Sequence, residues 1–138
     1  MNNYLKVVVF SLLVGLLCMI YFFKSNNKFT DVYAFQTGYF QTYNEALVNK
    51  EQYPSSVIIP GSDGFYVVVA IYEDMDLINK MLVYYEEKDI NVSIKKISCS
   101  KEFVQELNKY ETLANNIEDK ELYDKLNQNI LDMYISTI

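Results

Sequence analysis

An uninterrupted apolar segment near the amino terminus constrains this chain more than any other feature. Residues 7–23 read VVVFSLLVGLLCMIYFF, 17 residues without a charge, between Lys6 and Lys24. As a helix rising ~1.5 Å per residue the segment is roughly 25 Å long, close to the hydrocarbon thickness of a bilayer, about 30 Å. We therefore expect a membrane anchor over residues 7–23, with a cytoplasmic head over 1–6 and a linker over 24–30.

A cleaved signal peptide is the alternative interpretation of this segment. Tyr21, Phe22 and Phe23 stand where a signal peptide carries the small residues of its cleavage site, which favours a retained anchor. The head is short and 115 residues follow the anchor. Long domains cross membranes largely regardless of charge, so we expect a single-pass protein of the cell membrane whose carboxyl-terminal domain is extracytoplasmic.

The composition argues against several classes of protein. The chain has no His and has two Cys that lie 81 positions apart, so it lacks the residues of ordinary zinc sites and of Ser-His-Asp or Cys-His catalysis. Its net charge is −6 and its 12 positive side chains are all Lys, which argues against nucleic acid as a partner. Acidic pairs such as Glu73-Asp74 fall at expected helix starts, where they favour the helix dipole. We expect no enzyme activity, no metal and no cofactor.

The residues after the linker alternate between strand and helix patterns. Thr42 and Glu45 form a capping box, Asp74 can cap a second helix, and Pro60-Gly61 begins a turn between two strands. Strands are expected over residues 31–40, 56–59, 65–72 and 92–97, and helices over residues 43–52 and after Asp74. The order β-α-β-β-α-β over residues 31–98 predicts an α+β, ferredoxin-like domain.

Residues 99–138 predict a helical hairpin. Ser100 can cap a helix from Lys101 to Asn115, and Asn116 can cap a second helix from Glu118 to Ser136. Three arrangements are open for this extension. It packs on itself or against the domain, it binds a partner, or it covers part of the sheet.

Several residues of the first half of the domain match a known family. Gln36-x-Gly38-x-Phe40 ends the first strand, residues 44–46 (Asn-Glu-Ala) open the first helix, and residues 66–72 form the third strand. This pattern resembles the SPOR (sporulation-related repeat) domain family. The resemblance implies a membrane-anchored module that binds peptidoglycan glycan strands without stem peptides (denuded glycan), at sites of cell-wall remodelling in division or sporulation.

The resemblance also implies where a glycan would bind. In the family the saccharide lies across the sheet face opposite the helices, and a Gln amide with neighbouring aromatic rings suits the hydroxyl, acetamido and C–H groups of a glycan. The alternative for Gln36 is an ordinary polar residue on a solvated sheet face. The candidate glycan contacts are Gln36, Tyr66 and Val68, with Tyr39, Gln41 and Tyr43 at the corner between strand and helix.

One departure from the family pattern supports a second hypothesis. SPOR domains tend to carry an Arg and a second Gly in the third strand, where this chain has Tyr66 or Val68 and then Ala70. The protein would then be a membrane-anchored interaction subunit of an envelope complex that keeps the SPOR fold without sugar binding. Coverage of the glycan face by the carboxyl-terminal helices would also remove the sugar site.

Overall fold

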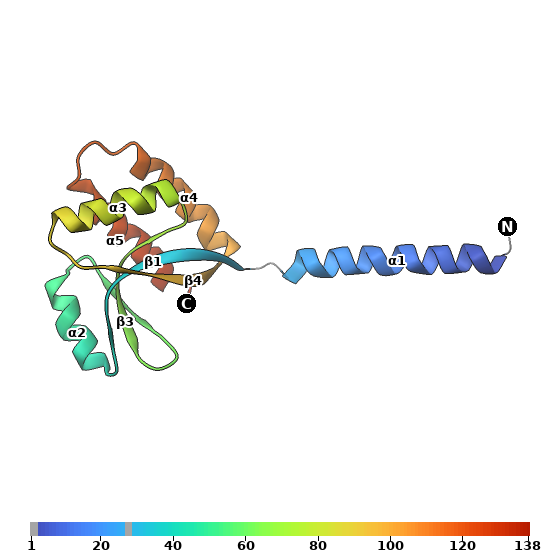
Figure 1. The fold of residues 1–138 in the computed structure, drawn as a ribbon, viewed down its shortest axis with the longest axis horizontal. Helices are drawn as coiled ribbons and strands as arrows, with labels where there is room; N and C mark the ends of the chain where they lie inside the picture. Colours follow the sequence, from blue (N-terminus) through green and yellow to red (C-terminus); the bar gives the residue numbers. More distant parts are fainter. Residues whose placement is uncertain (1–2, 27–28) are drawn as a thin grey trace.

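Helix α1 (Asn3–Asn26) contains the apolar segment. In the computed structural model, which describes residues 3–26 and 29–138, the large apolar side chains of α1 are exposed along its length (Figure 1). The stretch Tyr4–Phe23 has a mean hydropathy of 2.4. Among the described residues, one helix is long and apolar enough to cross a membrane, and it lies near the amino terminus.

The boundaries of the expected head and linker differ from the structure. Residues 3–6 and 24–26 belong to α1, and residues 29–30 already belong to the first strand. Residues 1–2 of the head and 27–28 of the linker lie outside the described residues. The helix is longer than the apolar run because backbone hydrogen bonding continues into its polar flanks.

The remaining elements follow the expected order β-α-β-β-α-β, and the fold is α+β. The fourth strand extends three residues beyond its expected end, as far as the cap of the next helix. The elements are β1 (Phe29–Phe40), α2 (Tyr43–Gln52), β2 (Val57–Pro60), β3 (Phe65–Tyr72), α3 (Met75–Glu87) and β4 (Ser93–Ser100).

The four strands form one antiparallel sheet in the order β2-β3-β1-β4. Gln36 in β1 lies opposite Val68 of β3 on one side and Ser93 of β4 on the other. The β1–β3 register is irregular on both sides of Gln36, between Phe35 and Gln36 and between Gln36 and Gly38. Such irregularities bend a strand, and Figure 1 shows β1 curving through this region.

The expected helix caps are confirmed for three helices. The Thr42 hydroxyl accepts from the Glu45 amide while the Glu45 carboxylate accepts from the Thr42 amide. The Asp74 carboxylate accepts from the Asp76 amide, and the Ser100 hydroxyl caps the next helix. Each cap satisfies amides that have no partner within their own helix, so these helices begin where the sequence predicts.

Two carboxyl-terminal helices complete the domain, α4 (Lys101–Asn115) and α5 (Leu122–Ile135). The expectation that Asn116 caps the second helix is wrong. Its side-chain amide donates to the Thr112 carbonyl of α4 at 2.8 Å, and residue 116 ends α4. Helix α5 begins four residues later than expected, and the residue before it, Glu121, makes no side-chain cap.

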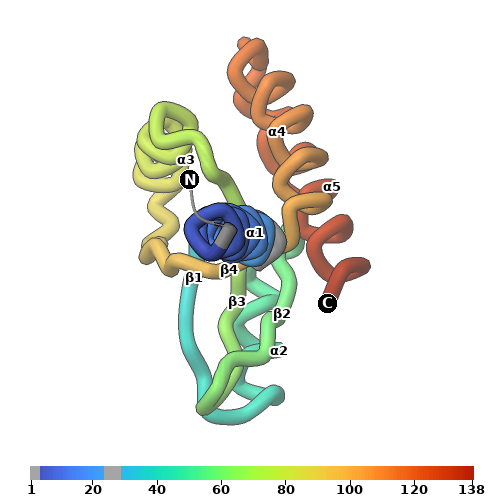
Figure 2. The backbone as a smooth tube through the Cα atoms, turned by 90° about the vertical axis from the view of Figure 1, so that its right-hand side faces the viewer, coloured from blue at the N-terminus to red at the C-terminus, as the bar shows by residue number. Residues whose placement is uncertain are grey.

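Helix α5 packs against the sheet. Residues 67–72 of β3 are each at most 3% exposed, so both faces of this strand are covered. Helix α2 contacts β1, β2 and β3, and α5 contacts β3 and β2. Figure 2 shows α4 and α5 together on the right of the strands and α3 on the left. The hairpin is thus an integral layer of the domain.

A buried polar network joins α5 to β3 and α3. Asn127, which is fully buried, accepts a hydrogen bond from the Tyr72 hydroxyl and donates one to the Tyr85 hydroxyl at 3.1 Å. The Tyr85 hydroxyl donates in turn to the Val69 carbonyl at 3.3 Å. The buried hydrophobic core around this network lies entirely between residues 32 and 134. Residues 29–138 therefore contain a complete core and should fold without α1.

Candidate functional site

Gln36 lies at a small pocket on the sheet. Its amide nitrogen donates to the Ser93 hydroxyl at 3.0 Å, whereas its amide oxygen is buried and has no hydrogen-bond partner among the described residues. The pocket has a volume of about 120 Å³, below the range of about 300–1,000 Å³ typical of small-molecule sites. Its walls come from all four strands and from α5: Ala34, Gln36, Ile59, Pro60, Gly61, Tyr66, Val68, Lys95, Ile97 and Tyr134.

Tyr134 of α5 covers part of the sheet face on which Gln36 lies. The side chain of Thr37, the next residue of β1, donates to Asn49 of α2 at 2.8 Å, whereas Gln36 lines the pocket with Tyr134. These two neighbouring side chains of β1 therefore meet different helices, α2 and the end of α5. Val68 is 2% exposed, which leaves its side chain no surface for a glycan.

Tyr66 forms the wall of the pocket beside Gln36. The Lys95 ammonium lies 3.3 Å from the centre of the Tyr66 ring, a cation–π contact. The Tyr66 ring also lies 4.8 Å, centre to centre, from the ring of Tyr39. Tyr66 is half-buried between these two neighbours. Lys95 therefore places one positive charge at the mouth of the pocket.

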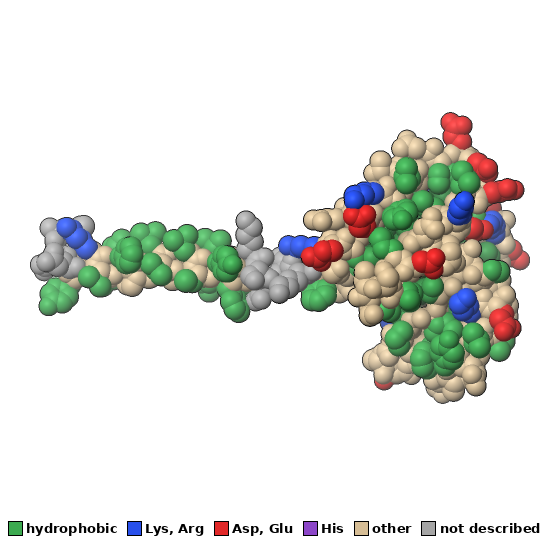
Figure 3. All heavy atoms as spheres, turned by 180° about the vertical axis from the view of Figure 1, so that it is seen from behind, with side chains coloured by type: hydrophobic (Ala, Val, Ile, Leu, Met, Phe, Trp, Pro, Cys, Tyr) green, Lys and Arg blue, Asp and Glu red, His purple; other side chains and the backbone are tan. Residues whose placement is uncertain are grey.

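Aromatic side chains gather at the end of the sheet where β1 leads into α2. Tyr39 is 43% exposed and Tyr43 is 52% exposed, and the Tyr43 ring meets Phe65 edge to face at 5.7 Å. In Figure 3 hydrophobic side chains gather at this end of the domain as well as along α1. We call this surface the aromatic tip and define it by Tyr39, Phe40, Tyr43, Phe65 and Tyr66.

Two glycines leave the space that these rings occupy. A Cβ atom at Gly61 would meet the ring of Tyr66, and a Cβ atom at Gly64 would meet the ring of Tyr39 and the backbone of β1. Both glycines lie in the β2–β3 turn, which was expected from its turn residues. The absence of side chains at these positions lets the aromatic rings pack over the turn.

The aromatic tip combines three of the candidate residues named from the sequence. Tyr39, Tyr43 and Tyr66 belong to it, and Gln41 is exposed at the same corner. Partial burial, together with the nearby Asp63 carboxylate, raises the pKa of Tyr39 above its ordinary value of 10.0. Rings with a polar hydroxyl are enriched at protein–protein interfaces, because they bury apolar area and still form hydrogen bonds.

Three contributors to this region had not been singled out from the sequence. Lys95 and Phe65 are in expected strands, but their partners Tyr66 and Tyr43 lie far along the chain. Tyr134 is one of the buried residues of α5, together with Tyr123 and Ile130. These residues are seven and four positions apart, a helical spacing from which the burial of Tyr134 could have been predicted.

Within the described ranges 3–26 and 29–138, no group of three or more Cys, Asp or Glu side chains is placed to hold a metal ion. The site offers one amide oxygen without a partner among the described residues, one Lys and several exposed rings. Comparison with known proteins found no family model, no curated protein and no solved structure that matches the chain.

Proposed function

We propose that this protein is a membrane-anchored interaction subunit that holds a protein partner through its aromatic tip. The observation that carries the proposal is the position of Tyr134, which lies over the sheet face where a glycan strand would have to bind. The burial of Val68 and the small volume of the pocket, about 120 Å³, support the proposal, because a glycan chain needs a long open surface.

We infer that the sheet domain is ferredoxin-like. The strand order β2-β3-β1-β4, the antiparallel pairing and the order β-α-β-β-α-β support this inference. The SPOR resemblance is compatible with the same order of elements. In this interpretation α4 and α5 are added to the ferredoxin-like order of elements, and they cover part of a sheet face that would otherwise be open to solvent.

The anchor and the aromatic tip lie at opposite ends of β1. Phe29 begins the strand shortly after α1, and Phe40 ends it at the tip. At ~3.3 Å per residue the strand is at most roughly 40 Å long. Tyr4 and Tyr21 near the two ends of α1 suit the membrane–water interfaces. In the proposed orientation the domain is extracytoplasmic and the tip is available to another envelope protein.

Glycan binding is the second candidate function. The unpartnered oxygen of Gln36 favours it, because an acetamido N–H could supply the missing hydrogen bond beside the Tyr66 ring. A glycan in this pocket would also contact Tyr134, which lines it from α5. The ring of Tyr39 packs against Tyr66 and would lie next to the bound glycan.

Sedimentation with purified sacculi separates the two functions. We expect folded residues 29–138 to stay in the supernatant, with sacculi before and after amidase removal of the stem peptides. Pelleting that increases on stripped glycan and is lost in Gln36→Ala would replace our proposal with the glycan function. Circular dichroism of each sample shows whether the domain is folded.

Site-specific photo-crosslinking in the source cells tests the partner directly. A photoreactive residue in place of Tyr43 should yield one crosslinked protein, and the same residue in place of Val83 on α3 should not. The two positions are equally exposed, each at 52%, so exposure alone cannot explain a difference. The crosslink should also weaken when Tyr39 is replaced by Ala. Equal labelling from both positions, or none, would contradict the proposal.

A further inference from the structure

The outer edge of β4 has no partner in the sheet. The strand order β2-β3-β1-β4 places β4 at one end, where all eight of its residues, Ser93–Ser100, pair with β1 in one continuous register. Alternate residues of an edge strand turn their N–H and C=O groups away from the sheet. Among the residues that the structure describes, no backbone hydrogen bond joins β4 to a segment outside the sheet. Every second residue of β4 therefore offers an unused donor and acceptor.

The opposite edge of the sheet, strand β2, is protected. This strand has four residues, ends at Pro60 and contacts α2 and α5. A short length, a Pro and a covering helix are common means of preventing an edge strand from pairing with another chain. Strand β4 has eight residues and no Pro, and its main contact besides β1 is α4, the helix that directly follows it. The two edges are therefore not equivalent.

The two Lys residues of β4 do not guard its free edge. Lys side chains often protect an edge strand by placing a charge where a second chain would bind. Here the Lys96 ammonium lies 3.3 Å from the Asp31 carboxylate of β1, and the Lys95 ammonium lies over the Tyr66 ring of β3. Both charges thus lean over the sheet, away from the edge. Ile94, which is 40% exposed, adds apolar surface to the strand.

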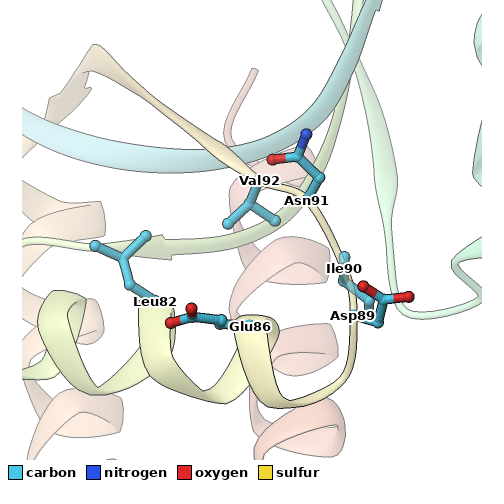
Figure 4. Close-up of a pocket in the computed structure, with 6 residues that line it drawn as sticks. All are labelled: Leu82, Glu86, Asp89, Ile90, Asn91 and Val92. Atoms are coloured by element: carbon cyan, nitrogen blue, oxygen red, sulfur yellow. The ribbon is translucent and has the colours of Figure 1, made fainter.

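The start of β4 is open as well. Figure 4 shows the turn from α3 to β4, where Asn91 and Val92 lie on the chain that leads into the strand. The residues that line the depression at this turn all belong to α3 or to the turn itself. No other element therefore contributes to the surface where β4 begins.

We propose that the free edge of β4 binds an extended segment of another membrane-anchored chain as an added antiparallel strand. The backbone of a second strand matches a row of alternating N–H and C=O groups, and these hydrogen bonds supply the affinity. In the proposed orientation β1 leads away from the membrane, because it begins at Phe29, three positions after α1 ends at Asn26. A partner segment that leaves the same membrane runs in the direction of β1, which is antiparallel to β4. The inference rests on the anchor of the proposed function and not on the aromatic tip.

A second copy of this chain fits the edge less well. Its own segment after α1 is already paired as β1. Antiparallel pairing of β4 with β4 would also make the two β1 strands antiparallel, so the two anchors would leave opposite ends of the joined sheet. The occupant is therefore a different chain, extended directly after its transmembrane helix. Ile94 and the half-buried Ile97 favour apolar, β-branched neighbours on the added strand.

Hydrogen exchange of the full chain in lipid bicelles, followed by nuclear magnetic resonance, tests the proposal with a synthetic peptide. The peptide has an Ala/Leu transmembrane helix of about 20 residues followed by Thr-Val-Thr-Ile-Thr-Val-Thr, and the control peptide has Pro in place of Ile. With the peptide at about ten times its dissociation constant, every second amide of β4 should exchange about tenfold more slowly, because only the unbound chain exposes it. Unchanged exchange in β4, equal slowing in β2, or equal slowing by the Pro peptide would overturn the proposal.

Three substitutions locate the bound peptide. Ile94→Ala should weaken binding by about two- to fivefold, the effect of one lost cross-strand pair. Leu113→Ala removes a side chain of α4 that is 58% exposed and should leave binding unchanged, so equal weakening by both would overturn the site. Tyr43→Ala should leave the slowing in β4 unchanged, because Tyr43 lies on α2 and contacts Phe65. If the Tyr43 variant lost the slowing, the peptide would lie on the aromatic tip and the edge site would be wrong, whereas crosslinking from Tyr43 tests the tip separately.

Discussion

The buried amide of Asn127 should make a large contribution to the free energy of unfolding, because it joins α5 to β3 and α3 by hydrogen bonds. Replacing Asn127 by Ala removes the acceptor of the Tyr72 hydroxyl and the donor to the Tyr85 hydroxyl. The Tyr85 hydroxyl keeps its bond to the Val69 carbonyl, but the Tyr72 hydroxyl is left as a buried donor without a partner. The two hydroxyls therefore lose different amounts of stabilisation.

The magnitude follows from these two losses. An unsatisfied buried donor costs about 1–3 kcal/mol, and one lost hydrogen bond costs about 1 kcal/mol more. We expect Asn127→Ala to lower the free energy of unfolding of residues 29–138 by about 2–4 kcal/mol. At ~4 °C per kcal/mol for a domain of this size, the melting temperature should fall by about 8–16 °C.

Urea unfolding followed by circular dichroism measures the effect, with Asn129→Ala as the control. Asn129 is exposed on the same helix, so its replacement should change the free energy of unfolding by less than about 0.5 kcal/mol. Adding Tyr72→Phe to Asn127→Ala removes the unsatisfied hydroxyl. The double variant should therefore be more stable than the sum of the single effects predicts, by about 1–2 kcal/mol. Additive effects, or equal stability of the two Asn variants, would refute the reasoning.

Three further predictions concern Glu111, Gly61 and Cys99. Burial, opposed by hydrogen bonds from the Asp74 and Glu73 amides, raises the pKa of Glu111 above its ordinary value of 4.5. The folded state then binds this proton more tightly than the unfolded chain, so the free energy of unfolding should fall as pH rises from 4.5 through the folded pKa. Urea titrations across that window should show no such fall for Glu111→Gln. Gly61→Ala should displace the Tyr66 ring and cost about 1–3 kcal/mol, and an unchanged near-ultraviolet circular dichroism spectrum would contradict this. Burial raises the pKa of Cys99 to about 11 and leaves 4% of the residue exposed, so iodoacetamide at neutral pH should alkylate it only after unfolding in urea. Alkylation of the folded domain at the unfolded rate would show that the thiol is accessible.

Local sequence signals located most elements of the domain correctly. The caps at Thr42, Asp74 and Ser100 each depend on residues within three positions, and all three helices begin as predicted. Helix α5 is the counterexample, because no side chain caps it and its start depends on packing. Its buried stripe includes Asn127, whose polar side chain is typical of a surface and whose partners come from β3 and α3.

The candidate site was predictable only in part. Strand pairing places Gln36 opposite Val68, two residues that the resemblance grouped together, and brings Tyr39 opposite Tyr66. The covering of this face by Tyr134 was not predictable, since the interpretation of the carboxyl-terminal helices left their position open. That single contact changes which of the two functions the geometry favours.

By itself, the sequence determined the apolar helix, the order of strands and helices, and the turns and caps between them. These features depend on composition and on neighbours a few positions away, where backbone hydrogen bonding and side-chain periodicity act. The tertiary structure alone decided that Tyr134 of α5 lines the pocket at Gln36, that the ring of Tyr39 packs on Tyr66, and that the ring of Tyr43 packs on Phe65. Such contacts join residues distant in sequence, and they form only when burial of the whole apolar core brings those residues together.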